Sequence, residues 1–221
     1  MHVVVNAAMS VDGKLASHRR EQLAISGPED FDRVDRIRAA ADGVIVGVGT
    51  VVADDPHLTL DVTDRRVQRQ RHGRPGNPAR VVADSTARTP LDARILDDEA
   101  TTYLLVSEQT SEERRTKLAD AGAEVIVVGD DRVDLAAGID RLADEGIERL
   151  MIEGGGELIF SAFDAGLVDE LSVFVGSQLI GGRDAPTLAD GDGFTEEFPA
   201  LTLDNIEQLD DGVVLKYTVE G

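Results

Sequence analysis

Apolar residues along the chain follow two alternating patterns. Short runs of β-branched and aliphatic residues are typical of buried strands, and stretches with apolar residues three or four positions apart are typical of helices. The expected strands are Val3–Ala8, Gly43–Val48, Val81–Ala83, Thr102–Val106, Glu124–Val128 and 149–152. The helices expected between them are 28–41, Ser111–Ala121, Leu135–Glu145 and Glu157–Ala165.

The C-terminal part changes character. Leu171–Val175, Leu201–Gln208 and Val213–Val219 read as strands without helices between them, and the last two are joined by Asp210-Asp211-Gly212, a hairpin signal. Alternating strands and helices followed by an antiparallel finish predict an α/β fold with one mixed, mostly parallel sheet flanked by helices. No internal repeat or composition break divides the chain, so we expect a single domain over residues 1–221.

The first helix has a clear start signal. Ser26-Gly27-Pro28-Glu29 offers a capping serine, a proline in the first turn and a glutamate three residues after the serine. The helix is expected to bury Phe31, Val34, Ile37 and Ala41. In contrast, residues 64–77 are polar and carry five arginines, which favours a solvated loop.

Turns rich in glycine or polar residues follow several predicted strands. They are residues 47–50, 84–88, 129–133 and 153–157, the last containing Glu153 and three consecutive glycines. If the strands are parallel neighbours, these turns meet at the edge of the sheet where open α/β folds bind ligands. Glycine lets a ligand approach the backbone, and the first turn of a helix offers unpaired N–H groups to an anion such as phosphate. The pattern therefore favours nucleotide binding over plain connections.

Composition limits the partners. The net charge is −21, from 43 acidic and 22 basic residues, and only three residues are lysine. Such a charge repels nucleic acids and anionic membranes, and it strains the folded state unless salt screens it. The chain has no cysteine, no signal-peptide pattern and no long apolar run. We expect a cytoplasmic protein of a salt-accumulating organism.

Other chemistries lack their sequence patterns. The four histidines have no spacing that suits a metal, and neither a G-x-S-x-G nucleophile elbow nor a G-x-x-x-x-G-K-[ST] phosphate loop occurs. The adjacent Asp54-Asp55 pair precedes a proline, which is common in turns. We therefore expect no metal site.

Several motifs together resemble the pyrimidine reductase family of riboflavin biosynthesis. They span nearly the whole chain in the family's order: Ser10-Val11-Asp12-Gly13-Lys14-Leu15-Ala16, Arg38-Ala39, Gly47-Val48-Gly49-Thr50-Val51, Asp54-Asp55-Pro56-His57-Leu58-Thr59, Val82-Ala83-Asp84-Ser85, Glu153-Gly154-Gly155-Gly156, Gly166-Leu167-Val168-Asp169-Glu170 and Gly181-Gly182. The chain length, with no room for a deaminase domain, is similar to that of the archaeal members.

This resemblance implies a dihydrofolate-reductase-like three-layer fold, a homodimer and hydride transfer from NADPH, with NADH also possible. The implied substrate is 2,5-diamino-6-ribosylamino-4(3H)-pyrimidinone 5′-phosphate, which is reduced at C1′ of its ribosylamino group to a ribityl product. In such a step the protein mainly aligns the reactants and stabilises developing charge.

The resemblance also implies roles for individual residues. Those matching cofactor contacts of the family are Thr50, Asp54, Ser85, Arg88, Gly129, Val133, Gly155, Gly156, Glu157 and Leu158. Substrate contacts are implied for Arg38, Leu58 and Lys14, and Glu153 matches a substrate-binding carboxylate that could act in catalysis.

Two departures from the family pattern stand out. Asp61 occupies the region where the family often has an arginine, so Lys14 or an arginine of residues 65–74 could hold the substrate phosphate instead. Glu157 places a negative charge beside the expected pyrophosphate, where it could simply favour the helix N-terminus. Two alternatives stay open: a reductase of the same fold acting on the deaminated pyrimidine or a dihydropterin, and a nucleotide-binding protein without catalysis.

Overall fold

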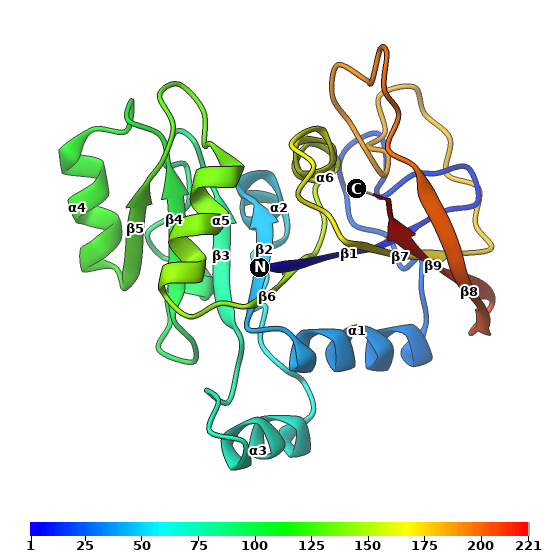
Figure 1. Cartoon of the computed structure of the whole chain (residues 1–221), viewed down its shortest axis with the longest axis horizontal. Coiled ribbons are helices and arrows are strands. Elements are labelled where there is room, and N and C mark those ends of the chain that lie inside the picture. The colour runs from blue at the N-terminus through cyan, green and yellow to red at the C-terminus, as the bar shows by residue number, and fades with distance from the viewer. Residues whose placement is uncertain (221) are drawn as a thin grey trace. The chain divides into compact units, whose positions relative to one another are not determined.

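The computed structural model describes residues 1–220, which form two compact units (Figure 1). We call residues 35–151 the central unit, and residues 2–34 with the chain from residue 152 onward the terminal unit. The helices are α1 (Pro28–Ala40), α2 (Val48–Asp54), α3 (Thr63–Arg71), α4 (Glu112–Asp120), α5 (Leu135–Asp144) and α6 (Gly156–Asp164), with a short 3₁₀ turn at Arg94–Leu96. Helix α1 runs from the terminal into the central unit.

The central unit contains the parallel part of the fold. Its strands are β2 (Gly43–Gly47), β3 (Ala79–Ala83), β4 (Thr102–Val106), β5 (Ala123–Val127) and β6 (Arg149–Ile152), in the order β5-β4-β3-β2-β6. The last residue of β6, Ile152, is already counted in the terminal unit. Strands β2 to β5 pair in parallel. Their continuous apolar runs are buried, as expected for strands with both faces covered. Helix α5 lies over β4, where Gly138 leaves room for Leu105 (Figure 1).

The terminal unit contains the antiparallel strand pairs of the C-terminal part. Its strands are β1 (His2–Met9), β7 (Glu170–Val175), β8 (Leu201–Leu209) and β9 (Gly212–Val219). Strand β1 pairs with β7 in parallel, and β9 lies antiparallel between β7 and β8. The predicted α/β fold, with its mixed strand pairing and C-terminal hairpin, is therefore confirmed.

The start of α1 differs from the prediction in two ways. The N–H groups of Glu29 and Asp30 donate to the carboxylate of Asp210, at 3.3 and 2.9 Å, so a residue of the β8–β9 turn caps this helix. The prediction that Phe31 is buried is wrong, because its side chain is 58% exposed. The buried face of this turn instead carries Asp30 and Arg33, which form an ion pair of 2.7 Å. Charged residues can occupy a buried helix face when they are paired.

The prediction of a solvated loop at residues 64–77 is also wrong. Most of the segment forms α3, and Arg69 is only 4% exposed. Arg69 and Arg74 donate to carbonyl groups at and just after the end of α1, including that of Ala41 at 2.6 Å from each. Cations are favourable at the C-terminus of a helix, where carbonyl groups lack partners. An arginine-rich segment therefore has a buried face, which a search for apolar periodicity cannot detect.

Candidate active site

Three turns of the central unit lie at one edge of its sheet. Residues 47–50, 84–88 and 129–133 follow β2, β3 and β5, whose parallel pairing places their carboxyl ends together. The expected turn at 47–50 is in fact the start of α2, since Gly47 directly precedes that helix. The convergence predicted for these three turns is confirmed, and the fourth turn, 153–157, belongs to the terminal unit and is described below.

Ser85 connects the loops at this edge. Its hydroxyl oxygen accepts a hydrogen bond of 3.0 Å from the N–H of Val133, and its carbonyl accepts one of 2.7 Å from the hydroxyl of Ser107. The carbonyl of Gly129 accepts from the N–H of Glu108 at 2.9 Å. Three predicted cofactor residues, Ser85, Gly129 and Val133, are thus held in one bonded group of loops. The sequence reading missed Ser107, although it follows β4 as Ser85 follows β3.

Asp84 fixes the turn that carries Ser85 and Arg88. Its side chain is fully buried and accepts hydrogen bonds from the N–H of Arg88 (2.8 Å), the N–H of Thr89 (2.8 Å) and the hydroxyl of Thr89 (2.7 Å). A buried carboxylate needs such donors to offset the loss of water. The side chain of Arg88 is exposed, which leaves its guanidinium accessible to an anionic group.

Helix α2 carries the next two predicted cofactor residues. Thr50 is half-buried and Asp54 is exposed; because they are four positions apart, they lie on the same face of the helix. Desolvation by the surrounding protein raises the pKa of Asp54 above its usual value. A Cβ on nearby Gly49 would meet only open space, so this helix presents its backbone without an overlying side chain.

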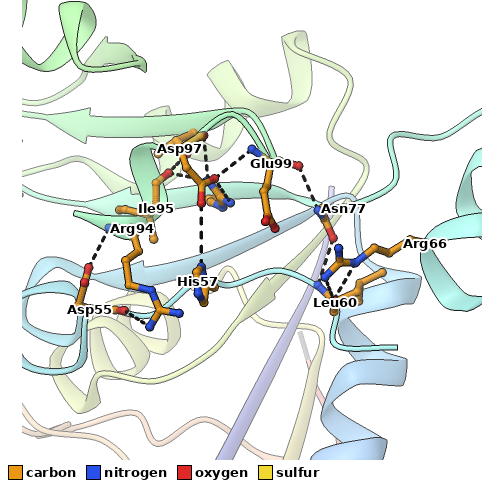
Figure 2. A network of polar contacts seen from close by, with 11 residues as sticks. Asp55, His57, Leu60, Arg66, Asn77, Arg94, Ile95, Asp97 and Glu99 are labelled. Carbon is orange, nitrogen blue, oxygen red and sulfur yellow. Dashed lines mark hydrogen bonds and ion pairs between the residues drawn. The ribbon is translucent and has the colours of Figure 1, made fainter. Parts of the chain in front are cut away.

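The segment after α2 is held by side chains from other elements (Figure 2). Asp55 accepts from the N–H of Arg94 at 2.9 Å, and His57 lies 4.0 Å from Asp97. The N–H of Leu60 donates to Asn77 at 3.1 Å, while Arg66 donates to the Leu60 carbonyl at 2.8 Å. These contacts set the path of residues 55–60, which contain the predicted substrate residue Leu58.

Arg38 and Leu58 are neighbours in the structure. The guanidinium of Arg38 donates to the carbonyl of Thr59 at 3.2 Å, and it has a further interaction besides. Leu58 has a left-handed backbone conformation (φ 54°) and is 3% exposed, so its side chain packs in the core. Any substrate contact at Leu58 would therefore depend on its backbone.

In the terminal unit, the glycine turn leads directly into α6. Gly154 and Gly155 have φ values of 98° and 90°, which favour glycine, and Gly155 offers no side chain to cap the helix. Glu153 is half-buried and makes a contact within the protein, whereas Glu157 is exposed. Leu158 is buried in the core, so it can meet a ligand only through its backbone. The turn and helix start are confirmed within one residue.

A loop from further along the terminal unit packs on this turn. The N–H of Asp190 donates to the carbonyl of Gly156 at 3.0 Å. A Cβ on Gly156 would lie 2.4 Å from the carbonyl oxygen of Thr187, so only glycine fits there. Part of the glycine signal at residues 154–156 therefore reflects packing against residues 187–190, a contact that the sequence does not reveal.

Lys14 lies in a tight turn after β1. Its N–H donates to the Ser10 hydroxyl oxygen at 2.9 Å, and its ammonium group donates to the Ala185 carbonyl at 3.3 Å. The neighbouring Asp12 accepts from the N–H groups of Ile180 (3.0 Å) and Gly181 (2.7 Å). Asp12 therefore ties the turn after β1 to the Gly181-Gly182 loop.

A change of pH should reveal the Asp12 contacts. The hydroxyl of Ser10 and the N–H groups of Ile180 and Gly181 lower the pKa of Asp12 from its ordinary 3.8 to about 2. A lowered pKa gives stability that is present above pH 3.8 and is lost as the pH falls toward 2. Chemical unfolding of Asp12→Asn should therefore show a weaker pH dependence than the wild type between about pH 4 and pH 2. Equal slopes for the two proteins would contradict this role.

The described residues contain no group of three or more acidic or histidine side chains arranged to hold a metal ion. None of the helices in the same residues is both long and apolar enough to cross a membrane.

Comparison with known proteins agrees with the motifs. Residues 1–215 match the model of the RibD C-terminal domain family. The chain is 46% identical over 211 residues to the 2,5-diamino-6-ribosylamino-4(3H)-pyrimidinone 5′-phosphate reductase of Archaeoglobus fulgidus, covering 96% of this chain and 94% of that one. Identity to the protein of the same name from Methanothermobacter thermautotrophicus is 45% over 223 residues, covering 100% of this chain and 99% of that one.

Solved structures show the same fold. A pyrimidine reductase-like protein from Corynebacterium diphtheriae superimposes with a TM-score of 0.87 at 22% identity, covering 100% of this chain and 92% of that one. RibD from Acinetobacter baumannii gives a TM-score of 0.83 at 26% identity, over 99% of this chain and 58% of that longer one. Motifs, fold and sequence identity agree, and the chain belongs to the RibD C-terminal domain family, the reductase part of riboflavin biosynthesis.

Proposed function

We propose that this protein reduces 2,5-diamino-6-ribosylamino-4(3H)-pyrimidinone 5′-phosphate to the ribitylamino product, with NADPH as the reductant. The observation that carries the proposal is the identity of 46% and 45%, over nearly the full length of each chain, to two reductases that bear this substrate in their names. When bound, NADPH would provide the hydride that reduces C1′ of the ring-opened imine form, while the adjacent nitrogen would take a proton.

The central unit would hold the cofactor through the turns at its sheet edge. Backbone groups around Ser85, Gly129 and Val133 suit the adenosine part, since these loops are already bonded to one another. The exposed Arg88 could pair with the 2′-phosphate that distinguishes NADPH from NADH. Thr50 and Asp54, which share one face of α2, would also contact the cofactor.

The terminal unit offers groups suited to a pyrophosphate and one acidic side chain. The N–H groups at Gly155, Gly156, Glu157 and Leu158 precede or begin a nine-residue helix that no Gly155 side chain caps, which suits phosphate oxygens. Glu153 would accept hydrogen bonds from the substrate and stabilise positive charge on the imine nitrogen. In the central unit, Arg38 or Arg66, which donate to the neighbouring carbonyls of Thr59 and Leu60, would bind the substrate phosphate. Lys14 is the candidate cation of the terminal unit.

The test is turnover by the intact protein, folded in high salt. With NADPH and the diamino substrate, absorbance at 340 nm should fall, and mass spectrometry should find the ribitylamino product. Turnover only with the deaminated pyrimidine or a dihydropterin would favour a related reductase. Nicotinamide binding without turnover on any of these substrates would favour a nucleotide-binding protein.

Salt should be required for stability. The charge of −21 repels itself, and the screening length shrinks from about 10 Å in 0.1 M salt to about 3 Å in 1 M salt. We expect the melting temperature to rise by about 10 °C between these concentrations of KCl, which corresponds to roughly 3–4 kcal/mol for a chain of this size. A melting temperature that is constant or falls in a thermal scan would refute a halophilic, salt-requiring cytoplasmic enzyme.

A homodimer is part of the proposal. Strand β8 has exposed apolar side chains at Leu203 (47%) and Ile206 (60%), and a long apolar edge strand is a favourable place for a second copy to pair. Light scattering in high salt should give twice the 23.6 kDa chain mass. A mass of one chain would contradict the dimer without affecting the proposed reaction.

A further inference from the structure

A small basic pocket lies between α3 and the end of α1, within the central unit. Its lining consists of Ala39, Arg65, Gln68, Arg69, His72 and Arg74. We call it the arginine pocket. It lies beside the segments that lead into β2 and β3, at the amino ends of these strands, and α3 lies below them in Figure 1. The predicted cofactor turns of the central unit lie at the opposite, carboxyl ends, so this pocket is separate from them.

Two of the arginines that line the pocket are paired with carboxylates. Arg65 lies 2.6 Å from Asp35, and Arg74 lies 2.7 Å from Asp42. Arg69 differs, because its hydrogen bonds go only to the carbonyls of Ala39 (2.8 Å), Ala41 (2.6 Å) and Pro75 (3.0 Å). The partial negative charge at the end of α1 offsets only part of a full positive charge.

Because Arg69 is buried, a positive charge that is only partly offset is energetically unfavourable. Arg69 is 4% exposed, and desolvation, together with the nearby Arg74, lowers its pKa to about 10, although the charge of Asp42 acts in the opposite direction. Among the hydrogen bonds of the described residues, none involves the Nη2 group of Arg69, although this side chain lines the pocket. An anion in the pocket would add negative charge to that of Asp42 and would offer an acceptor to Nη2.

We propose that the arginine pocket binds a small inorganic oxyanion of the phosphate class. Its volume of about 200 Å³ is below the range of roughly 300–1,000 Å³ that holds drug-sized ligands, which argues against a whole nucleotide. Guanidinium groups present planar, forked donors that match the oxygens of phosphate or sulfate. The bound ion joins α3 to the end of α1, and it therefore stabilises the central unit.

Two substitutions on α3 test the proposal with the same change of charge. Gln68 and Gln70 are both exposed, but only Gln68 lines the pocket. Gln68→Glu places a carboxylate at the proposed anion site, whereas Gln70→Glu adds the same charge elsewhere on the helix. Inorganic phosphate is titrated into the full chain at constant, high KCl, and the ring signals of His72 are followed by NMR, assigned with a His72→Asn variant.

The wild type and Gln70→Glu should show a saturable shift of the His72 signals, and Gln68→Glu should bind phosphate at least tenfold more weakly. Sulfate should compete with phosphate in the wild type. No saturable shift in the wild type, or equal weakening in both glutamate variants, would overturn the proposal. Phosphate bound at the proposed active site does not confuse the result, because it should leave the His72 signals unchanged.

Discussion

Replacing Glu153 by glutamine is expected to lower kcat by about 10²- to 10³-fold, the range found when one charge-stabilising group is removed from an active site. The carboxylate follows β6 directly and precedes the glycine turn, where it would stabilise the protonated, positively charged imine that accepts the hydride. Glutamine keeps the shape of the side chain but lacks its charge. The KM for NADPH should change less than about threefold, because the loss affects the transition state more than cofactor binding.

Steady-state kinetics with NADPH varied at a saturating concentration of the diamino substrate separates these two effects. Glu148→Gln is the matched control, since Glu148 is exposed at the start of the same strand region and the change in charge is identical. An unchanged kcat in Glu153→Gln would remove this carboxylate from the mechanism. A large rise in the KM for NADPH with kcat preserved would instead assign Glu153 to cofactor binding.

Replacing Asp84 by alanine should reduce the free energy of unfolding by about 3 kcal/mol. The substitution leaves three donors without their partner, the N–H groups of Arg88 and Thr89 and the hydroxyl of Thr89, and an unsatisfied buried donor costs about 1–3 kcal/mol. Because the same turn carries Ser85 and Arg88, the affinity for NADPH should fall as well. Denaturant unfolding in high salt and cofactor titration measure the two effects.

Asp92→Ala provides the control for Asp84→Ala. Asp92 is exposed, so removing its carboxylate makes the same change in charge without leaving buried donors. It should alter the free energy of unfolding by less than about 0.5 kcal/mol. If Asp84→Ala changed the free energy of unfolding as little as this control, the hydrogen bonds to Asp84 would not stabilise the turn.

Much of the fold follows from local patterns. The run Val44–Val46 is apolar on both faces, and it forms a fully buried central strand as predicted. Ser111 and Asp134 accept hydrogen bonds from the third residues of their helices, Arg114 and Ala137, as capping residues should. These features depend on residues close in sequence, which explains why they could be predicted.

The errors have long-range causes. Helix α1 is capped by Asp210, some 180 positions away, and its charged residues are buried because Arg33 bonds Asp30 and Ser172. In α3 the buried side chain is Arg69, whose partners are carbonyls of another helix. Neither arrangement leaves an apolar period in the sequence. Phe31 was wrongly expected in the core for the same reason.

In the candidate site, too, the features set by local sequence could be predicted, whereas those set by tertiary contacts could not. Parallel pairing of β2 to β5 was enough to predict that the turns after β2, β3 and β5 converge. The hydrogen bond from Val133 to Ser85, the support from Ser107 and the packing of residues 187–190 on Gly156 depend on tertiary contacts. Sequence spacing cannot distinguish a glycine needed for a ligand from one needed for such packing.

In the proposed reaction, loops distant along the chain hold reduced NADPH beside C1′ of the sugar. The most direct test supplies NADPH deuterated at C4 of the nicotinamide, with the diamino substrate, to the protein folded in high salt. Deuterium is expected at C1′ of the ribityl product, where mass spectrometry and NMR detect it. A product without deuterium at that carbon when either C4 position is labelled, or no consumption of NADPH at all, would contradict it.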